Sequence, residues 1–246
     1  MTTAMTAPMP TTTAAARLEA AVKVYGAGPT AVRALDGVTV ELPARRLTAV
    51  MGPSGSGKST LMHCLAGLDR LTSGRAFVGG VELGSLSDKE LTLHRRRQVG
   101  FVFQSFNLVP TLTAAENITL PLDLAGTRPD RGWLDMLVAT LGIGDRLTHR
   151  PSELSGGQQQ RVAVARALAS RPEVIFADEP TGNLDSRTSA EILGLLRRAV
   201  DDFDQSVVMV THDPVAASYA DSTVLVADGR IVDHLDAPDT AAVVEP

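Results

Sequence analysis

The sequence predicts an α/β protein built on a mostly parallel central sheet. Short apolar segments alternate with helical stretches along the 246 residues, as in chains whose parallel strands are joined by helices. Residues 174–177 and 207–210 are continuously apolar, which is typical of strands buried on both faces of a parallel sheet. A glycine-rich stretch at residues 52–59 lies between an expected strand and an expected helix, where a phosphate-binding loop belongs.

Six strands are expected, at residues 38–42, 47–52, 99–104, 174–178, 206–213 and 222–229. The first two alternate apolar and polar residues more than the other four, so we assign them to an antiparallel edge. The stretch 105–150 has a helical and loop-like composition broken by prolines. This stretch indicates an inserted helical lobe.

The chain divides into a tail and one domain. Residues 1–16 are rich in Thr, Ala and Pro, and we expect them to form a disordered tail. The domain covers residues 17–240, with a core made of 17–104 and 166–240 and a helical subdomain at about 105–165. The sequence has no internal repeat, so each chain carries one nucleotide-binding unit.

Composition excludes several classes of protein. The net charge of −5 argues against a general nucleic-acid binder, which carries a basic face. The single cysteine, Cys64, excludes an internal disulfide framework and a cysteine-based zinc site. No apolar run approaches the roughly 18 residues of a membrane span, and the N-terminus lacks the pattern of a secretory signal. We therefore expect a soluble, cytoplasmic protein with no nucleic-acid partner.

The stretch "GPSGSGKS" matches the pattern of a phosphate-binding loop. Its glycines allow backbone N–H groups to point at phosphate oxygens, and the helix that follows adds its positive N-terminal end. A glycine turn that merely starts a helix is the alternative, which the strand and helix on either side make less favourable. The expected nucleotide contacts are Gly52, Pro53, Ser54, Gly55, Ser56, Gly57, Lys58, Ser59 and Thr60.

Two carboxylates follow the apolar segment "VIFA". Asp178 at the end of this strand is placed to hold Mg²⁺, and Ser59 would supply a hydroxyl ligand to the same ion. Glu179 can act as the base toward a water that attacks the terminal phosphate. The alternative is a solvated turn, which the nearby phosphate-binding pattern disfavours. GTPases read guanine with an Asn-Lys-x-Asp element. In this chain no lysine follows an asparagine, so we expect ATP.

A second glycine-rich helix start lies about a hundred residues after the first. Ser155 is a good N-cap, and Gly156 and Gly157 keep the backbone bare at the positive end of the next helix. A plain capped helix remains the alternative. The segment, called here the signature segment, consists of Leu154, Ser155, Gly156, Gly157 and Gln158.

With these motifs the chain resembles the ATP-binding subunits of ABC transporters. The segments "GPSGSGKST", "LSGGQ", "VIFADE" and "NLD", with Gln104 and His212, occur in that family's order and spacing, and the resemblance covers residues 18–233. It implies a P-loop NTPase (RecA-like) core with a mostly parallel sheet, an antiparallel β edge and an inserted helical subdomain. It also implies a homodimer in which each signature segment covers the ATP held by the partner's phosphate loop.

The resemblance assigns further roles. Tyr25 would stack on adenine, although covering an edge of the core is the alternative for this ring. Gln104 would touch Mg²⁺ and the attacking water and sense a membrane partner. Asp185 would bridge the two sites of the dimer, and His212 would bond the γ-phosphate and position the water. The implied catalytic residues are Glu179, His212 and Lys58, and the implied Mg²⁺ ligands are Ser59, Gln104 and Asp178.

Within the family, the sequence resembles the branch that includes macrolide exporters, lipoprotein-releasing ATPases and a cell-division ATPase. Asn183 stands where alanine is common elsewhere in the family, as is usual for this branch. The resemblance implies a separate permease and a position at the inner face of the cell membrane. Phe106, Leu108 and Val109 could line the permease groove or pack within the helical lobe. A regulatory ATPase that drives a membrane partner in cell-envelope control without solute transport stays open.

Overall fold

A mixed six-stranded sheet forms the centre of the computed structural model, which describes residues 14–236. Its strand order is β10–β9–β3–β8–β7–β6. Every neighbouring pair runs parallel except β10 and β9, which are antiparallel. Its strands are β3 (Leu47–Met51), β6 (Val99–Phe103), β7 (Val174–Asp178), β8 (Val207–Val210), β9 (Ser222–Ala227) and β10 (Arg230–Asp236).

The expected antiparallel edge is right for one strand and wrong for the other. Residues 38–42 lie in an antiparallel strand, as predicted. Residues 47–51 instead form β3, which lies inside the large sheet, parallel to β8 and β9, with all five residues buried. The polar residue that suggested alternation, Thr48, is buried because its hydroxyl lies 3.4 Å from the Ser222 hydroxyl.

A second, antiparallel sheet has the order β2–β1–β4–β5. Three residues that we expected in the tail, Ala14 to Ala16, are buried and belong to its strand β1, so the predicted tail is too long there. They are held because β1 pairs with both β2 and β4. Residues 1–13 of the expected tail lie outside the described residues. The strands are β1 (Ala14–Tyr25), β2 (Val32–Pro43), β4 (Ser73–Val78) and β5 (Val81–Glu82).

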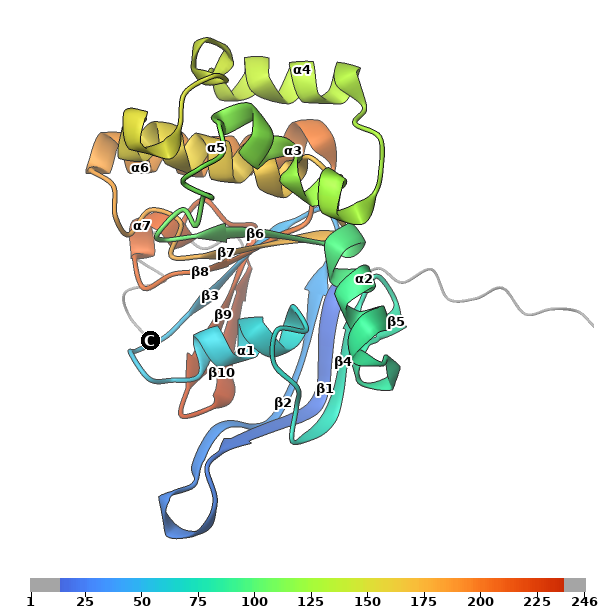
Figure 1. Cartoon of the computed structure of the whole chain (residues 1–246). Coiled ribbons are helices and arrows are strands. Elements are labelled where there is room, and N and C mark those ends of the chain that lie inside the picture. The colour runs from blue at the N-terminus through green and yellow to red at the C-terminus, as the bar shows by residue number, and fades with distance from the viewer. Residues whose placement is uncertain (1–13, 237–246) are drawn as a thin grey trace, which may run out of the picture.

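The helices lie on both faces of the six-stranded sheet. In Figure 1, α3, α4, α5 and α6 lie on one face, and α1 lies on the other, between the two sheets. Each face has its own apolar core, and none of the helices in residues 14–236 is long and apolar enough to cross a membrane. The helices are α1 (Lys58–Leu65), α2 (Asp88–Gln98), α3 (Ala114–Ala125), α4 (Arg131–Leu141), α5 (Gly156–Leu168), α6 (Ser186–Phe203) and α7 (Pro214–Ala217). Short 3-10 turns lie at Gly28–Thr30, Leu83–Ser85, Gly144–Arg146 and Pro151–Glu153.

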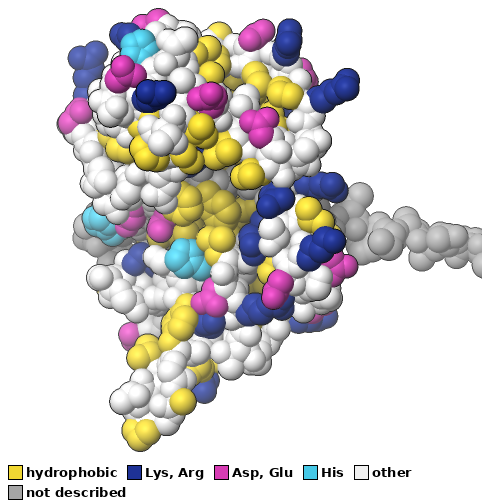
Figure 2. Space-filling view, viewed as in Figure 1, with side chains coloured by type: hydrophobic (Ala, Val, Ile, Leu, Met, Phe, Trp, Pro, Cys, Tyr) yellow, Lys and Arg dark blue, Asp and Glu magenta, His cyan; other side chains and the backbone are white. Residues whose placement is uncertain are grey.

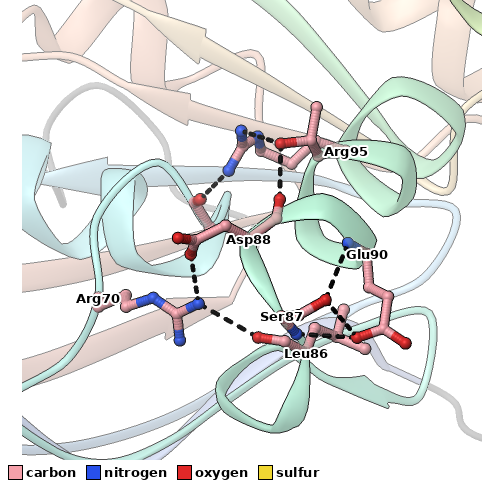
Figure 3. Close-up of polar contacts among 8 residues, drawn as sticks. Arg70, Leu86, Ser87, Asp88, Glu90 and Arg95 are labelled. Atoms are coloured by element: carbon pink, nitrogen blue, oxygen red, sulfur yellow. Dashed lines mark hydrogen bonds and ion pairs between the residues drawn. The ribbon is translucent and has the colours of Figure 1, made fainter.

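Helix α2 begins in a network of polar contacts, drawn in Figure 3. Ser87 and Glu90 form a reciprocal capping box, with the Ser87 N–H donating to Glu90 and the Glu90 N–H donating to the Ser87 hydroxyl. Arg70 donates to Asp88 at 2.8 Å, and Arg95 donates to the Gly67 carbonyl at 2.6 Å. Because α2 runs directly into β6, these contacts help to set the position at which β6 enters the sheet.

Helices α3 and α4 and most of α5 make up the predicted helical lobe. Helix α5 continues unbroken to Leu168 and packs against β6, so it joins the lobe to the sheet. Trp133 ties α4 to this unit, since its indole N–H donates to the Leu168 carbonyl at 3.1 Å and its ring meets Phe203 edge-on at 5.0 Å. The helical lobe is therefore anchored on the sheet through α5.

Candidate functional site

The phosphate loop joins the end of β3 to α1 and depends on glycine. Gly57, the N-cap of α1, has a φ of +103°, and a Cβ there would lie 2.4 Å from the Ala34 carbonyl oxygen. A Cβ on Gly52 would lie 1.9 Å from the Val226 carbonyl oxygen. In the described part of the chain, no side chain caps the first turn of α1. Its N–H groups are thus available to an anion.

Lys58 lies against the same loop. It is 9% exposed, and its ammonium donates to the carbonyl oxygens of Gly52 at 2.8 Å and Pro53 at 2.7 Å. Burial lowers the pKa of Lys58, and the negative charges of Glu179 and Asp178 raise it again in part. A buried cation whose hydrogen-bond partners among the described residues are carbonyl oxygens is suited to bind a phosphate.

A hollow of about 350 Å³ opens beside this loop. Ser59 and Thr60 line it from α1, and Arg33 lines it from β2. The nearby Ser56 hydroxyl is buried and has no hydrogen-bond partner among the described residues. The hollow thus offers hydroxyls and basic groups to a polar, anionic ligand.

The carboxyl ends of the parallel strands bring the predicted catalytic residues together. Phe103 of β6 lies in register with Asp178 of β7, so Gln104 and Glu179 each follow at the same end of the sheet. Asp178 in turn lies in register with Val210 of β8, two residues before His212. Burial raises the pKa of Asp178. This edge of the sheet is where ligands of open α/β folds bind.

Glu179 has a left-handed backbone, with a φ of +45°. Its N–H donates to the Val210 carbonyl at 2.9 Å, and its Oε1 lies 2.8 Å from His212 Nδ1. The Thr211 hydroxyl lies 3.4 Å from the second carboxylate oxygen. A non-glycine residue in this region costs free energy and is often found at functional sites. His212 and Thr211 thus contact the two carboxylate oxygens of Glu179, and its left-handed backbone sets the direction of the side chain.

Gln104 makes a pair of hydrogen bonds that the sequence analysis missed. Its Nε2 donates to Asn183 Oδ1 at 3.1 Å, and Asn183 Nδ2 donates to the Gln104 carbonyl oxygen at 3.0 Å. The same region contains Gln160, which is fully buried and donates to the carbonyl oxygens of Phe103 and Pro180. Nothing in the stretch "ELSGGQQQR" indicated that the polar side chain of Gln160 would be buried.

Tyr25 lies in a polar cluster at the end of β1. It is 40% exposed, its hydroxyl donates to Asp69 at 2.7 Å, and the Lys23 ammonium lies 4.7 Å from its ring centroid. Burial and the Asp69 hydrogen bond raise the pKa of Tyr25. Tyr25 does not line the hollow beside the phosphate loop, so adenine stacking stays a prediction.

The signature segment lies apart from the phosphate loop of its own chain. Ser155 caps α5, accepting from the Gln158 N–H at 3.3 Å, while Gln158 accepts from the Ser155 N–H at 2.9 Å. A Cβ on Gly157 would lie 2.5 Å from Thr188 Cγ2 of α6, so this glycine has a packing role as well. Figure 1 places α5 and α1 on opposite faces of the sheet.

Asp185 also lies at a helix start. It caps α6, accepting from the Thr188 N–H at 3.0 Å and from the Thr188 hydroxyl at 2.7 Å. These hydrogen bonds lower the pKa of Asp185. Asp185 is exposed, so its carboxylate is accessible to another molecule.

Comparisons with known proteins show to which family the chain is similar. A family model described as "ABC transporter" matches residues 35–182. An uncharacterized ABC transporter ATP-binding protein of Thermotoga maritima is 47% identical over 211 residues, which are 85% of this chain and 90% of that one. The macrolide export ATP-binding/permease protein MacB of Brucella melitensis is 46% identical over 218 residues, which are 88% of this chain but 34% of that one.

A solved structure shows the same fold. It is the dimeric post-hydrolysis state of the ATP-binding cassette MJ0796 bound to ADP and Pi, with a TM-score of 0.81 and 37% identity. The match covers 91% of this chain and 99% of that one. Over nearly its whole length, the chain therefore resembles a nucleotide-binding cassette.

Proposed function

The chain belongs to the ABC transporter ATP-binding family and is an ATPase, and we propose that two copies close head to tail around two ATP molecules to drive a separate membrane protein. The observation that carries this proposal is that α1, which follows the phosphate loop, and α5, which begins in the signature segment, lie on opposite faces of the sheet. Each is one half of an anion site, and a second copy would complete both halves. The dimeric MJ0796 cassette supports this arrangement.

Oxygen donors near the phosphate loop fit Mg²⁺. Asp178 offers a carboxylate whose pKa is raised by burial, so a nearby cation would compensate its desolvated charge. With Ser59 and Gln104 it supplies the few oxygen ligands that Mg²⁺ takes beside nucleotide phosphates. When bound, the ion would neutralise charge on the phosphates. We assign these three residues to it.

For the chemical step we assign the base to Glu179. Its carboxylate would accept a proton from the water that attacks the γ-phosphate, and His212 and Thr211 keep the carboxylate in place. Lys58 and the N–H groups at the start of α1 would neutralise charge on the transferred phosphoryl group, which is where most catalysis in such reactions lies. Residues 52–60 hold the phosphates, and Tyr25 would stack on adenine.

A groove beside β6 suits the membrane partner. Phe101, Leu120, Pro121 and Leu124 line this apolar groove of about 230 Å³, and Leu124 is 54% exposed. Figure 2 shows apolar side chains gathered between the upper helices and the lower part of the molecule, with Lys and Arg side chains beside them over α2. A short helix of a permease would bury this surface.

Phe106, Leu108 and Val109, for which a permease groove or packing within the helical lobe was expected, stay a prediction. Leu108 packs on the core of the helical face, and none of these three residues lines the apolar groove beside β6. Docking at the apolar groove would place the chain at the inner face of the cell membrane. The MacB relative, named for export, favours export over a purely regulatory role, and solute flux in reconstituted vesicles tests that choice.

Mixing two inactive variants tests the shared sites. A phosphate-loop variant, Lys58→Ala, and a signature variant, Ser155→Arg, should each lose turnover alone. Mixed, they should recover up to about a quarter of the wild-type rate, because random pairing makes half the dimers mixed and each keeps one intact site. The control is the double variant mixed with itself, which stays inactive. No recovery in the mixture, despite ATP-dependent pairing, argues against sites shared between chains.

The groove has its own test. Leu124→Glu should prevent co-purification of the native membrane protein with the tagged chain, because a charge would be buried in the contact. Val232→Glu, on the 61% exposed Val232 of β10, is the matched control and should leave co-purification unchanged. Equal retention by both variants would place the docking surface elsewhere.

A further inference from the structure

We propose that Asn183 is the residue that positions the side-chain amide of Gln104 so that its oxygen is free to act as a ligand. This inference rests on the proposed function, in which Gln104 contributes an oxygen to Mg²⁺. It assigns a defined task to Asn183, a residue outside the phosphate loop, the signature segment and the catalytic carboxylates. Asn183 does not itself touch the nucleotide in this scheme.

The direction of the two hydrogen bonds follows from the backbone carbonyl group of Gln104, which can only accept. The backbone carbonyl oxygen of Gln104 is an acceptor, so the Asn183 atom 3.0 Å from it must be the donor Nδ2. Asn183 Oδ1 is therefore the atom that faces the Gln104 side chain. Because Oδ1 can only accept, the atom of Gln104 that lies 3.1 Å from it must be Nε2.

This reasoning removes the usual ambiguity between the nitrogen and oxygen of a side-chain amide. A rotated Gln104 amide would set two acceptor oxygens against each other and lose a hydrogen bond. With Nε2 committed to Asn183, the atom left over is Oε1. A carbonyl oxygen is a ligand for a hard cation such as Mg²⁺, and an amide nitrogen is not.

The backbone around the pair is held by other contacts, so the pair is not an incidental meeting of two mobile loops. Buried Gln160 donates to the carbonyl oxygens of Phe103 and Pro180, and thus ties the end of β6 to the segment that leads to Asn183. A Cβ on Gly182 would lie 2.7 Å from Gln104 Nε2. Glycine there permits the close approach.

The segment after Gln104 is fixed from the side of α5. Phe106 and Asn107 have left-handed backbones, with φ values of +60° and +50°. Arg166 donates to both of their carbonyl oxygens, at 2.9 Å and 2.6 Å. Since α5 holds the backbone on both sides of Gln104, the remaining freedom is in its side chain, which Asn183 restricts.

Variants at Asn183 separate positioning from folding. Asn183→Ala removes both hydrogen bonds, and Asn183→Asp sets an acceptor against the Gln104 carbonyl. Residues that orient a metal ligand typically change affinity or activity by about 10–100-fold when replaced. We expect the Mg²⁺ concentration for half-maximal ATP turnover to rise by about 10-fold in Asn183→Ala, with an unchanged melting temperature. Gln98→Ala, an amide removed just before β6, is the control and should match wild type.

A measurement without metal or nucleotide tests the same pair directly. The ¹⁵N–¹H side-chain signals of Gln104, identified by their loss in Gln104→Ala, should be those of a hydrogen-bonded amide in the wild-type chain. In Asn183→Ala they should move to the position of a freely rotating amide. Signals that are identical in both proteins overturn the proposal.

The double variant gives the final test. If Asn183 acts only through Gln104, Asn183→Ala should raise the Mg²⁺ requirement no further in a Gln104→Ala chain. Additive effects overturn the positioning role. A Gln104→Ala chain with the wild-type Mg²⁺ requirement would instead remove Gln104 from the metal site, and both this inference and that part of the proposed function would be wrong.

Discussion

His212 Nδ1 lies 2.8 Å from Glu179 Oε1, and the two side chains come from the ends of neighbouring parallel strands. The Glu179 backbone is left-handed, and Thr211 lies within hydrogen-bonding distance of its other carboxylate oxygen. The histidine side chain is 75% exposed while the carboxylate is 20% exposed. The carboxylate is thus held in place by a partner that is itself open to solvent or to a second molecule.

Glu179→Gln should abolish most turnover while ATP still binds. The amide keeps the shape of the side chain but cannot accept a proton, and loss of a general base costs about 10²–10⁴-fold in rate. ATP-loaded dimers should then accumulate, which phosphate release and size-exclusion chromatography would measure. Glu41→Gln, at an exposed residue of β2, is the matched control. Wild-type turnover in Glu179→Gln would place the base elsewhere.

Gly57→Ala should disrupt the phosphate loop, and Gly55→Ala should be tolerated better. Both glycines have positive φ, but a Cβ at Gly57 meets the Ala34 carbonyl oxygen at 2.4 Å, whereas none of the described atoms lies within 4 Å of a Cβ at Gly55. Gly55→Ala should cost about 1–2 kcal/mol, and Gly57→Ala more than that, with loss of ATP binding. Thermal unfolding and calorimetric ATP binding measure both effects. Equal effects at the two positions would contradict the steric explanation.

Asp178→Asn should stabilise the ligand-free protein at neutral pH. Burial raises the pKa of Asp178 in the folded state, so the folded chain holds this proton more tightly than the unfolded chain. Stability from this group is present below pH 3.8, its unfolded value, and is lost as pH rises through the folded pKa. A neutral amide avoids that loss. Melting temperatures at pH 7 should therefore be higher for Asp178→Asn.

The same variant should respond less to Mg·ATP. A ligand that binds only the folded state raises the melting temperature of the protein more when it binds more tightly, and Asp178→Asn would bind Mg²⁺ less well. Asp145→Asn, with a side chain 71% exposed, serves as the matched control. A lower melting temperature for ligand-free Asp178→Asn would contradict the desolvation argument.

Cys64 should resist alkylation in the folded protein. The side chain is 1% exposed, and burial raises the pKa of its thiol to about 12. Because the thiolate is the reactive form, iodoacetamide labelling at pH 8 should proceed only as fast as the chain unfolds. A cysteine placed at Leu68, which is 47% exposed, should label rapidly in the same experiment. Fast labelling of native wild-type protein would show that this core opens.

Parts of the fold could be predicted because their signal is local. The strands at 174–178, 206–213 and 222–229 were confirmed, with ends shifted by up to three residues. Residues 174–177 and 207–210 carry the strongest signal, because parallel strands buried on both faces are continuously apolar. The place of β3 was wrong because Thr48 looked like an outward-facing residue. Nothing along the chain indicates that its hydroxyl would meet Ser222, 174 residues away.

By itself, the sequence determined the phosphate loop, the carboxylates that end β7 and the capped start of α5, because each depends on a few contiguous residues and on one helix or strand end. Only the tertiary structure decided that α5 and α1 lie on opposite faces of the sheet and that Asn183 meets Gln104 across 79 positions. Such pairs form when strands and helices pack, and packing depends on shape and register that no single segment contains.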